Sequence, residues 1–243
     1  MIDRRTFVGT AAVGGALLGS GCISALGGNE NVVLSPPENY DLLRDAELPY
    51  PIYGESLPEA TVEAPLRDSE VSVPTDFEGD RHVLLTFIFT RCTGVCPGLT
   101  ANLVRAQADA AERGYSDEVA LTAITFDPVH DDEDVLRQYA DDRGVDRDAD
   151  NFYLLRPDGE ERGKEVVEET YGHGYQKTEL YSPEGELEHG GNETDSDAPS
   201  QPFDHMPLFF LVNKDGYVER SYANTAPKSS TVVEDLRALQ EGY

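Results

Sequence analysis

The sequence predicts an α/β protein in which a central mixed β-sheet is flanked by helices. Two nearly continuous apolar runs, 83–89 and 119–126, are typical of strands that are buried on both faces. Each run is followed by a segment with apolar residues at helical spacing, through 99–110 and 135–139. Near the end of the chain, a turn at 213–216 joins two further strands, and a helix follows them. This order of strands and helices indicates a mixed sheet covered by helices.

Local signals predict where these elements begin and end. Gly114 is expected to end the first helix. Asp127-Pro128 breaks the second strand, and either Asp131 or Asp132 can cap the helix that follows. The other expected elements are a short strand at 152–155, a helix at 161–171, strands at 207–212 and 217–221, and a terminal helix at 232–239.

Residues 1–22 are predicted to form an export signal. Arg4 and Arg5 form a twin-arginine pair before a weakly hydrophobic run, which is typical of the route that exports folded proteins. The run ends at Cys22 in a stretch that resembles a lipobox, so we expect a lipid on Cys22. Plain cleavage nearby, or an uncleaved anchor, is the alternative. The protein is therefore expected to be exported and tethered to the outer face of the cell membrane.

The rest of the chain divides into a tether and one domain. Residues 23–58 are rich in Gly, Pro, Asn and Glu without periodicity, so they are predicted to be a flexible tether. Residues 59–243 are predicted to form the domain. Within it, residues 184–200 are rich in Gly, Glu, Asp and Ser, and they are expected to form a mobile acidic loop.

The charge of the chain excludes some classes of function. Its 47 acidic and 19 basic side chains give a formal net charge of −28. No nucleic-acid partner is expected, because phosphate binding needs a basic stripe. A strongly acidic surface with few lysines is typical of halophilic proteins, which stay soluble in concentrated salt. An acidic protein from a less saline environment is the alternative.

Cys92 and Cys96 are the candidate functional pair. The chain has three cysteines, so lipidation of Cys22 would leave one pair in an exported protein. The pair joins a predicted strand to the first turn of a helix, where free N–H groups and a partial positive charge favour thiolates. Side chains four residues apart share one helix face, so the sulfurs can close a disulfide or hold one metal ion. An inert disulfide is the alternative, although so short a loop would gain little stability from it.

Three motifs follow one another over roughly residues 60–242. They are Phe-Ile-Phe-Thr-Arg-Cys-Thr-Gly-Val-Cys-Pro at 87–97, Asp-Pro-Val-His-Asp at 127–131, and Asp204-His205, with Tyr171 and Tyr175 as a further Tyr-x-x-x-Tyr element. Together they resemble the Sco (SenC-type) family of thioredoxin-fold copper chaperones for cytochrome oxidase assembly. The resemblance implies a thioredoxin-like fold. Thioredoxin-like oxidoreductases have two residues between their cysteines, whereas three residues here leave room for a metal ion.

The resemblance also implies that Cys92, Cys96 and His205 bind a copper ion, either Cu⁺ or Cu²⁺. Two thiolates and an imidazole suit copper in both states. Zinc is the rival, but structural zinc sites use four ligands and the sequence offers no convincing fourth. Asp127 and Asp204 are candidates for a supporting role around the ligands.

The implied role is a chaperone that delivers copper to, or prepares, the copper A site of a cytochrome oxidase subunit. The alternative is a thiol–disulfide oxidoreductase that acts on cysteines of exported or membrane proteins. It would need Cys92 and Cys96 but not His205. A thiol reductant is a further expected partner, because the cysteine pair must be kept reduced.

The remaining histidines and one peptide bond complete the expectations. His173 lies in the tyrosine element and can approach the site, whereas His82, His130 and His189 are expected to be solvated. The Met206–Pro207 bond stands where thioredoxin folds commonly have a cis-proline, and both cis and trans are open at this point.

Overall fold

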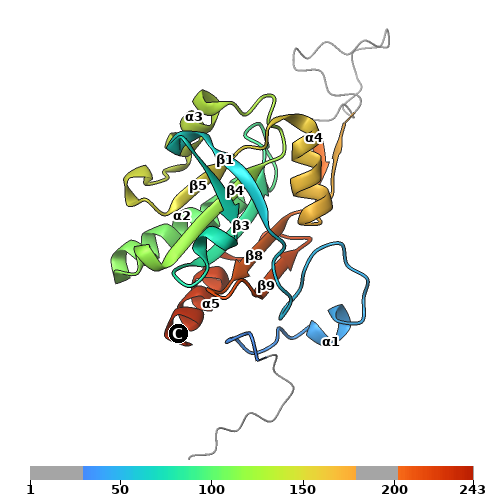
Figure 1. The fold of residues 1–243 in the computed structure, drawn as a ribbon, viewed down its shortest axis with the longest axis vertical. Coiled ribbons are helices and arrows are strands. Elements are labelled where there is room, and N and C mark those ends of the chain that lie inside the picture. The colour runs from blue at the N-terminus through green and yellow to red at the C-terminus, as the bar shows by residue number, and fades with distance from the viewer. Residues whose placement is uncertain (1–29, 179–201, 243) are drawn as a thin grey trace, which may run out of the picture.

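The computed structural model describes residues 30–178 and 202–242. The predicted export signal with Cys22 and the acidic loop at 184–200 lie outside the described residues. The centre of the fold is a five-stranded sheet in the order β5-β4-β3-β8-β9 (Figure 1). Strands β3, β4 and β5 run parallel, whereas β8 is antiparallel to β3 and to β9, so the predicted mixed sheet is confirmed. The strands are β3 (His82–Ile88), β4 (Val119–Thr125), β5 (Phe152–Leu155), β8 (Leu208–Val212) and β9 (Val218–Ala223).

Three long helices flank the sheet (Figure 1). Helix α2 (Cys96–Arg113) connects β3 to β4, and α3 (Glu133–Arg143) connects β4 to β5. Because parallel crossovers are right-handed, both helices lie on the same face of the sheet. The terminal helix α5 (Ser229–Gly242) packs against α2. The predicted order of strands and helices therefore holds throughout the central sheet.

The helix ends follow the predicted local signals. Gly114 ends α2 with a φ of 80°, the left-handed conformation that glycine adopts at little cost. Asp132 caps α3, and its side chain accepts a hydrogen bond of 2.9 Å from the backbone N–H of Val135. Since Asp132 is the cap, the neighbouring Asp131 is available for another role.

Two small hairpins were not predicted from the sequence. One pairs β1 (Ala60–Ala64) with β2 (Ser69–Val73), and the other pairs β6 (Tyr175–Lys177) with β7 (Phe203–His205). These strands have three to five residues each, which is too short for a clear alternation signal. The helix expected at 161–171 is present as α4 (Gly159–Gly163), which continues as a π-helical segment, Lys164–Thr170. A short helix, α1 (Tyr40–Leu43), precedes the first hairpin.

Residues 30–58 pack against the domain, which corrects the prediction of a flexible tether for this part of the chain. The carboxylate of Glu219, fully buried on β9, accepts hydrogen bonds from the backbone N–H groups of Val33 at 2.8 Å and Leu34 at 2.9 Å. Further along the segment, five apolar side chains are buried: Leu34, Tyr50, Ile52, Tyr53 and Leu57. Composition did not reveal this packing, because it depends on β9, about 185 residues later.

The same segment touches the chain just before the second small hairpin. Gly172 has a φ of 71°, and a Cβ atom placed on it would lie 1.9 Å from the carbonyl oxygen of Pro49. Only glycine permits this approach, because it lacks the Cβ atom. The backbone at Pro49 therefore supports the start of the link that leads into β6.

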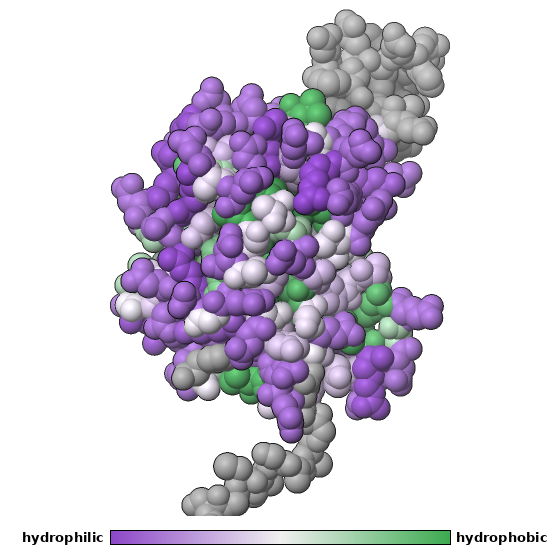
Figure 2. Space-filling model, viewed as in Figure 1, coloured by the Kyte–Doolittle hydropathy of each residue, from purple (hydrophilic) through white to green (hydrophobic). Residues whose placement is uncertain are grey.

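The surface is polar and the core is continuous. Hydrophilic residues cover most of the face shown in Figure 2. The buried apolar side chains of the sheet and helices form one cluster. Among the described residues, no helix is long and apolar enough to cross a membrane.

Candidate metal centre

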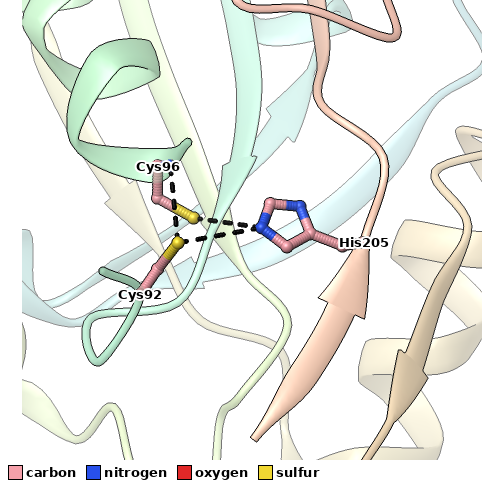
Figure 3. A group of neighbouring side chains, drawn as sticks. All are labelled: Cys92, Cys96 and His205. Carbon is pink, nitrogen blue, oxygen red and sulfur yellow. Dashed lines mark hydrogen bonds between the residues drawn. The ribbon is translucent and has the colours of Figure 1, made fainter. Parts of the chain in front are cut away.

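The fold places the two cysteines at the junction of β3 and α2. Cys92 lies in the loop after β3, and Cys96 is the first residue of α2, where Pro97 occupies the first turn. The backbone N–H of Cys96 points to the Sγ of Cys92 at 3.4 Å (Figure 3). Both cysteines are free thiols, and both side chains are buried. The helix start therefore directs one of its unused N–H groups at a sulfur.

The two thiols differ in acidity. A hydrogen bond from the Cys96 side chain lowers the pKa of Cys92 to about 4, and further hydrogen bonds from His205 and two backbone N–H groups outweigh the effect of burial. Burial raises the pKa of Cys96, and the hydrogen bond to Cys92 and its charge add to that increase. Cys92 is therefore the more acidic of the two thiols, and we assign to it the first proton that the pair loses.

His205 completes the group from a distant part of the chain. It is the last residue of β7, where it pairs with Tyr175 of β6. Its Nε2 atom lies 3.8 Å from the Sγ of Cys92 and 3.5 Å from the Sγ of Cys96 (Figure 3). The predicted approach of His205 to both sulfurs is therefore present, on the same side of the sheet as the cysteine loop.

The donor atoms of these three residues fit one metal ion. All of them lie within 4.8 Å of one another. The Nε2 of His205 lies 3.8 and 3.5 Å from the two sulfurs, which is close enough for both cysteines and the imidazole to hold the same ion. Two thiolates and one imidazole form a soft donor set that suits copper.

Two buried carboxylates hold the cysteine loop against the loop after β4. Asp127 forms an ion pair of 2.5 Å with Arg91, which precedes Cys92. Asp131 is fully buried and accepts hydrogen bonds from the backbone N–H of Thr90 at 3.1 Å and from the hydroxyls of Thr90 and Thr125 at 2.5 Å each. Sequence reasoning proposed Asp127 for a supporting role but considered Asp131 only as a helix cap. The signal for Asp131 was its place at the end of the 127–131 motif.

Asp204, the other proposed supporting carboxylate, is exposed. Adjacent residues of a strand face opposite sides, so its side chain is directed away from the side that His205 faces. Asp204 is therefore not brought together with the cysteines. The Met206–Pro207 bond that follows is trans, and the cis peptide bond among the described residues is Val73–Pro74.

The other histidines lie in different environments. His82 is fully buried at the start of β3 rather than solvated. His130 is partly exposed, and its Nδ1 lies 3.0 Å from a carboxylate oxygen of Asp131. His173, whose approach to the site the sequence left open, is fully buried, and its ring centroid lies 5.6 Å from that of His205. Burial, with the nearby His205, lowers the pKa of His173 to about 3, so its imidazole is neutral. His189 lies outside the described residues.

Comparisons with solved structures find the same fold in proteins of one family. A SCO1/SenC family lipoprotein from Bacillus anthracis str. Ames is 19% identical, with 76% of this chain and 95% of that chain covered and a TM-score of 0.57. Apo Sco1 from Thermus thermophilus is 26% identical, with 80% and 98% covered and a TM-score of 0.56. Yeast Sco1 with copper bound is 16% identical, with 79% and 91% covered and a TM-score of 0.55. The predicted thioredoxin-like fold is thus confirmed.

Sequence comparison identifies the family directly. A search of curated proteins gives no significant match. The sequence profile of the SCO1/SenC family, however, matches residues 67–241, which includes the cysteine pair and His205. That span covers most of the 243 residues. The chain therefore belongs to the SCO1/SenC family.

Proposed function

We propose that this protein is a copper chaperone that holds one copper ion on Cys92, Cys96 and His205 and delivers it to, or prepares, the copper A site of a cytochrome oxidase subunit. The convergence of two sulfurs and one imidazole nitrogen within 4.8 Å carries this proposal. Membership of the SCO1/SenC family supports it, as do relatives whose structures contain copper, from yeast and from Arabidopsis thaliana. A Bacillus relative is described as a member of a family of cytochrome c oxidase assembly proteins.

The burial of the three ligands implies an order of release. His205 is partly exposed, Cys92 is 4% exposed, and Cys96 is fully buried. An incoming ligand of the target therefore reaches the His205 side of the ion first. Copper can then move by stepwise exchange between soft ligands, because a thiolate or imidazole of the target replaces each of its ligands in turn. Cys96 would be the last of the three ligands to release the copper ion.

The acidity of the cysteines supports a second activity, thiol–disulfide exchange. The Cys92 thiolate would attack one sulfur of a target disulfide, and the other target sulfur would leave as a thiolate. Cys96, on losing its proton, would then attack the Cys92 sulfur, which releases the reduced target and forms a Cys92–Cys96 disulfide. An external dithiol must reduce that disulfide before another cycle. The two activities can follow each other, since a target must have reduced cysteines before it accepts copper.

The location proposed for this activity is the outer face of the cell membrane. The twin arginine at positions 4 and 5 and the lipobox-like stretch before Cys22 support export and a lipid anchor. Oxidising conditions there make a thiol reductant necessary. A net charge of −28 with few lysines supports a saline environment for the exported domain.

The test combines metal analysis with a reduction assay on the purified, reduced protein. The wild type should retain about one copper ion per chain against a competing chelator, and His205→Ala should lose it. His205→Ala should still reduce an oxidised peptide that carries the cysteine pair of a copper A loop, because attack depends on the thiolate. His189→Ala serves as the control and should retain copper. Full copper retention by His205→Ala would refute the three-ligand site, and a wild type that reduces the peptide but binds no copper would favour the oxidoreductase alone.

A further inference from the structure

His173 is a buried histidine in an aromatic environment. It lies in the link between the π-helical segment and β6, and its side chain has no exposed surface. Its ring stacks on Phe87 at a centroid distance of 4.7 Å and lies 5.3 Å from the ring of Phe126. Neither ring nitrogen has a hydrogen-bond partner among the described residues. Burying a polar group without a hydrogen-bond partner costs about 1–3 kcal/mol, and an apolar side chain at this position would avoid that cost.

His205 has a matching feature on its inner side. Its Nε2 faces the two sulfurs, whereas its Nδ1 is buried and has no hydrogen-bond partner among the described residues. Aromatic rings also lie next to the His205 ring, with the centroid of Phe126 at 5.1 Å and that of Phe89 at 5.7 Å. His173, whose two ring nitrogens likewise have no hydrogen-bond partner among the described residues, belongs to this aromatic group, and its ring centroid lies 5.6 Å from that of His205 at an angle of 52°.

The chemistry of metal-binding histidines suggests a role for His173 next to His205. A histidine that binds a metal ion through one nitrogen normally donates the N–H of the other to an acceptor, which fixes the tautomer and the orientation of the ring. His205 would bind through Nε2, so its Nδ1–H needs an acceptor. Two nitrogens bridged by one water molecule, with a hydrogen bond of about 2.9 Å on each side, lie about 4.7 Å apart, and ring centroids 5.6 Å apart are compatible with that separation. A buried water normally has such polar partners.

We propose that His173 is a positioning residue for His205, linked to its Nδ1 through one buried water molecule. This inference rests on the proposed copper site. When Nε2 binds copper, Nδ1–H donates to the water, and the water donates to the lone pair of the neutral His173 ring. The link holds the His205 ring with Nε2 toward Cys92 and Cys96. It also explains why a histidine occupies a position otherwise lined by phenylalanine and tyrosine.

The first arm of the test measures Cu⁺ affinity by competition with a chelator. His173→Phe removes the acceptor but keeps a flat ring, so affinity should fall about 10- to 100-fold, as for other groups that support a ligand. His173→Gln can still accept a hydrogen bond and should recover most of that loss. His82→Phe is the matched control, because it also replaces a fully buried histidine but lies at the opposite end of β3. It should leave Cu⁺ affinity unchanged.

The second arm needs neither copper nor a variant. A high-resolution crystal structure of the reduced wild type should show an ordered water within hydrogen-bond distance of the His205 Nδ1 and a His173 ring nitrogen. Rings in direct apolar contact, with no water between them, would overturn the inference. So would a His173→Phe protein that folds and binds Cu⁺ as tightly as the wild type. A wild type that binds no Cu⁺ would instead refute the proposed function, while the crystal structure would still decide the pairing.

Discussion

The Nε2 of His205 lies 3.5 Å from the Sγ of Cys96, although 109 residues separate the two in the chain. This contact exists because β7 ends beside the start of α2. Neither element alone forms a metal site, since the cysteine pair offers two donors and β7 offers one. Four measurements can test the cysteine pair, the carboxylate that holds its loop, and two further contacts that stabilise the fold.

The first prediction concerns the reactivity of the cysteine pair. Alkylation of Cys92 by a neutral reagent should be nearly independent of pH from about 5 to 8, because its pKa is lowered to about 4 and the thiolate is present throughout. Cys96 should react slowly over the same range, since burial raises its pKa. Mass spectrometry of the labelled peptides gives each rate. Cys96→Ala lacks the hydrogen bond that contributes most to the lowered pKa of Cys92, so the pH profile of Cys92 alkylation should shift to higher pH. A wild-type profile with a midpoint near 8 would contradict the assigned thiolate.

The second prediction concerns the carboxylate that holds the cysteine loop. Asp131→Asn should lower the free energy of unfolding by about 2–3 kcal/mol, because hydrogen bonds to a buried charged group are lost. It should also weaken Cu⁺ binding, since Thr90 is no longer held next to the loop. Denaturant titration and chelator competition measure the two effects. Asp134→Asn is the control, because its side chain is 91% exposed, and it should change stability by less than about 0.5 kcal/mol. Equal effects of the two substitutions would argue against the role of Asp131.

The third prediction compares two glycines on either side of His173. Gly172→Ala should destabilise the protein and loosen residues 49–50, because a Cβ would collide with the Pro49 carbonyl and the φ of 71° strains any other residue. Gly174→Ala meets no atom within 4 Å and should be nearly neutral. Hydrogen exchange of the backbone amides of Tyr50 and Ile52, together with thermal unfolding, distinguishes the variants. Similar exchange in both would show that the contact at Pro49 does not hold the segment.

The fourth prediction concerns stability at acid pH. The guanidinium of Arg237, aided by hydrogen bonds from Tyr115 and Arg113, lowers the pKa of Asp109 to about 2 despite its burial. A carboxyl whose pKa is lower in the folded state stabilises the protein above its unfolded pKa, and the contribution fades as the pH falls through its folded pKa. Asp109→Asn should therefore cost about 2 kcal/mol at pH 7, and the difference from the wild type should shrink between about pH 4 and 2. Denaturant titrations at several pH values measure it. A difference that stays constant down to pH 2 would contradict the assigned pKa.

The sequence by itself determined the central sheet, its helices and the position of the cysteine pair. The runs at 83–89 and 119–126 are apolar over their whole length, and buried parallel strands have this local pattern. Gly114 and Asp132 lie at helix ends for reasons confined to a few neighbouring residues. The placement of two cysteines at the start of a helix is likewise local. His205 was identified through the resemblance of its motif, not through any local pattern.

Only the tertiary structure decided how distant residues meet. His205 lies next to the sulfurs, and His173 is buried beside it. Asp131 accepts a hydrogen bond from the backbone N–H of Thr90, and Glu219 accepts hydrogen bonds from the backbone N–H groups of residues 33–34. Each of these contacts links segments whose local sequences carry no signal of the other. Residues 30–58 look like a linker by composition, yet the backbone at Val33 and Leu34 is bound to a buried carboxylate on β9, which needs hydrogen-bond donors. Local periodicity reports which face of an element is buried, whereas the partner of a buried polar group is set by packing across the whole chain.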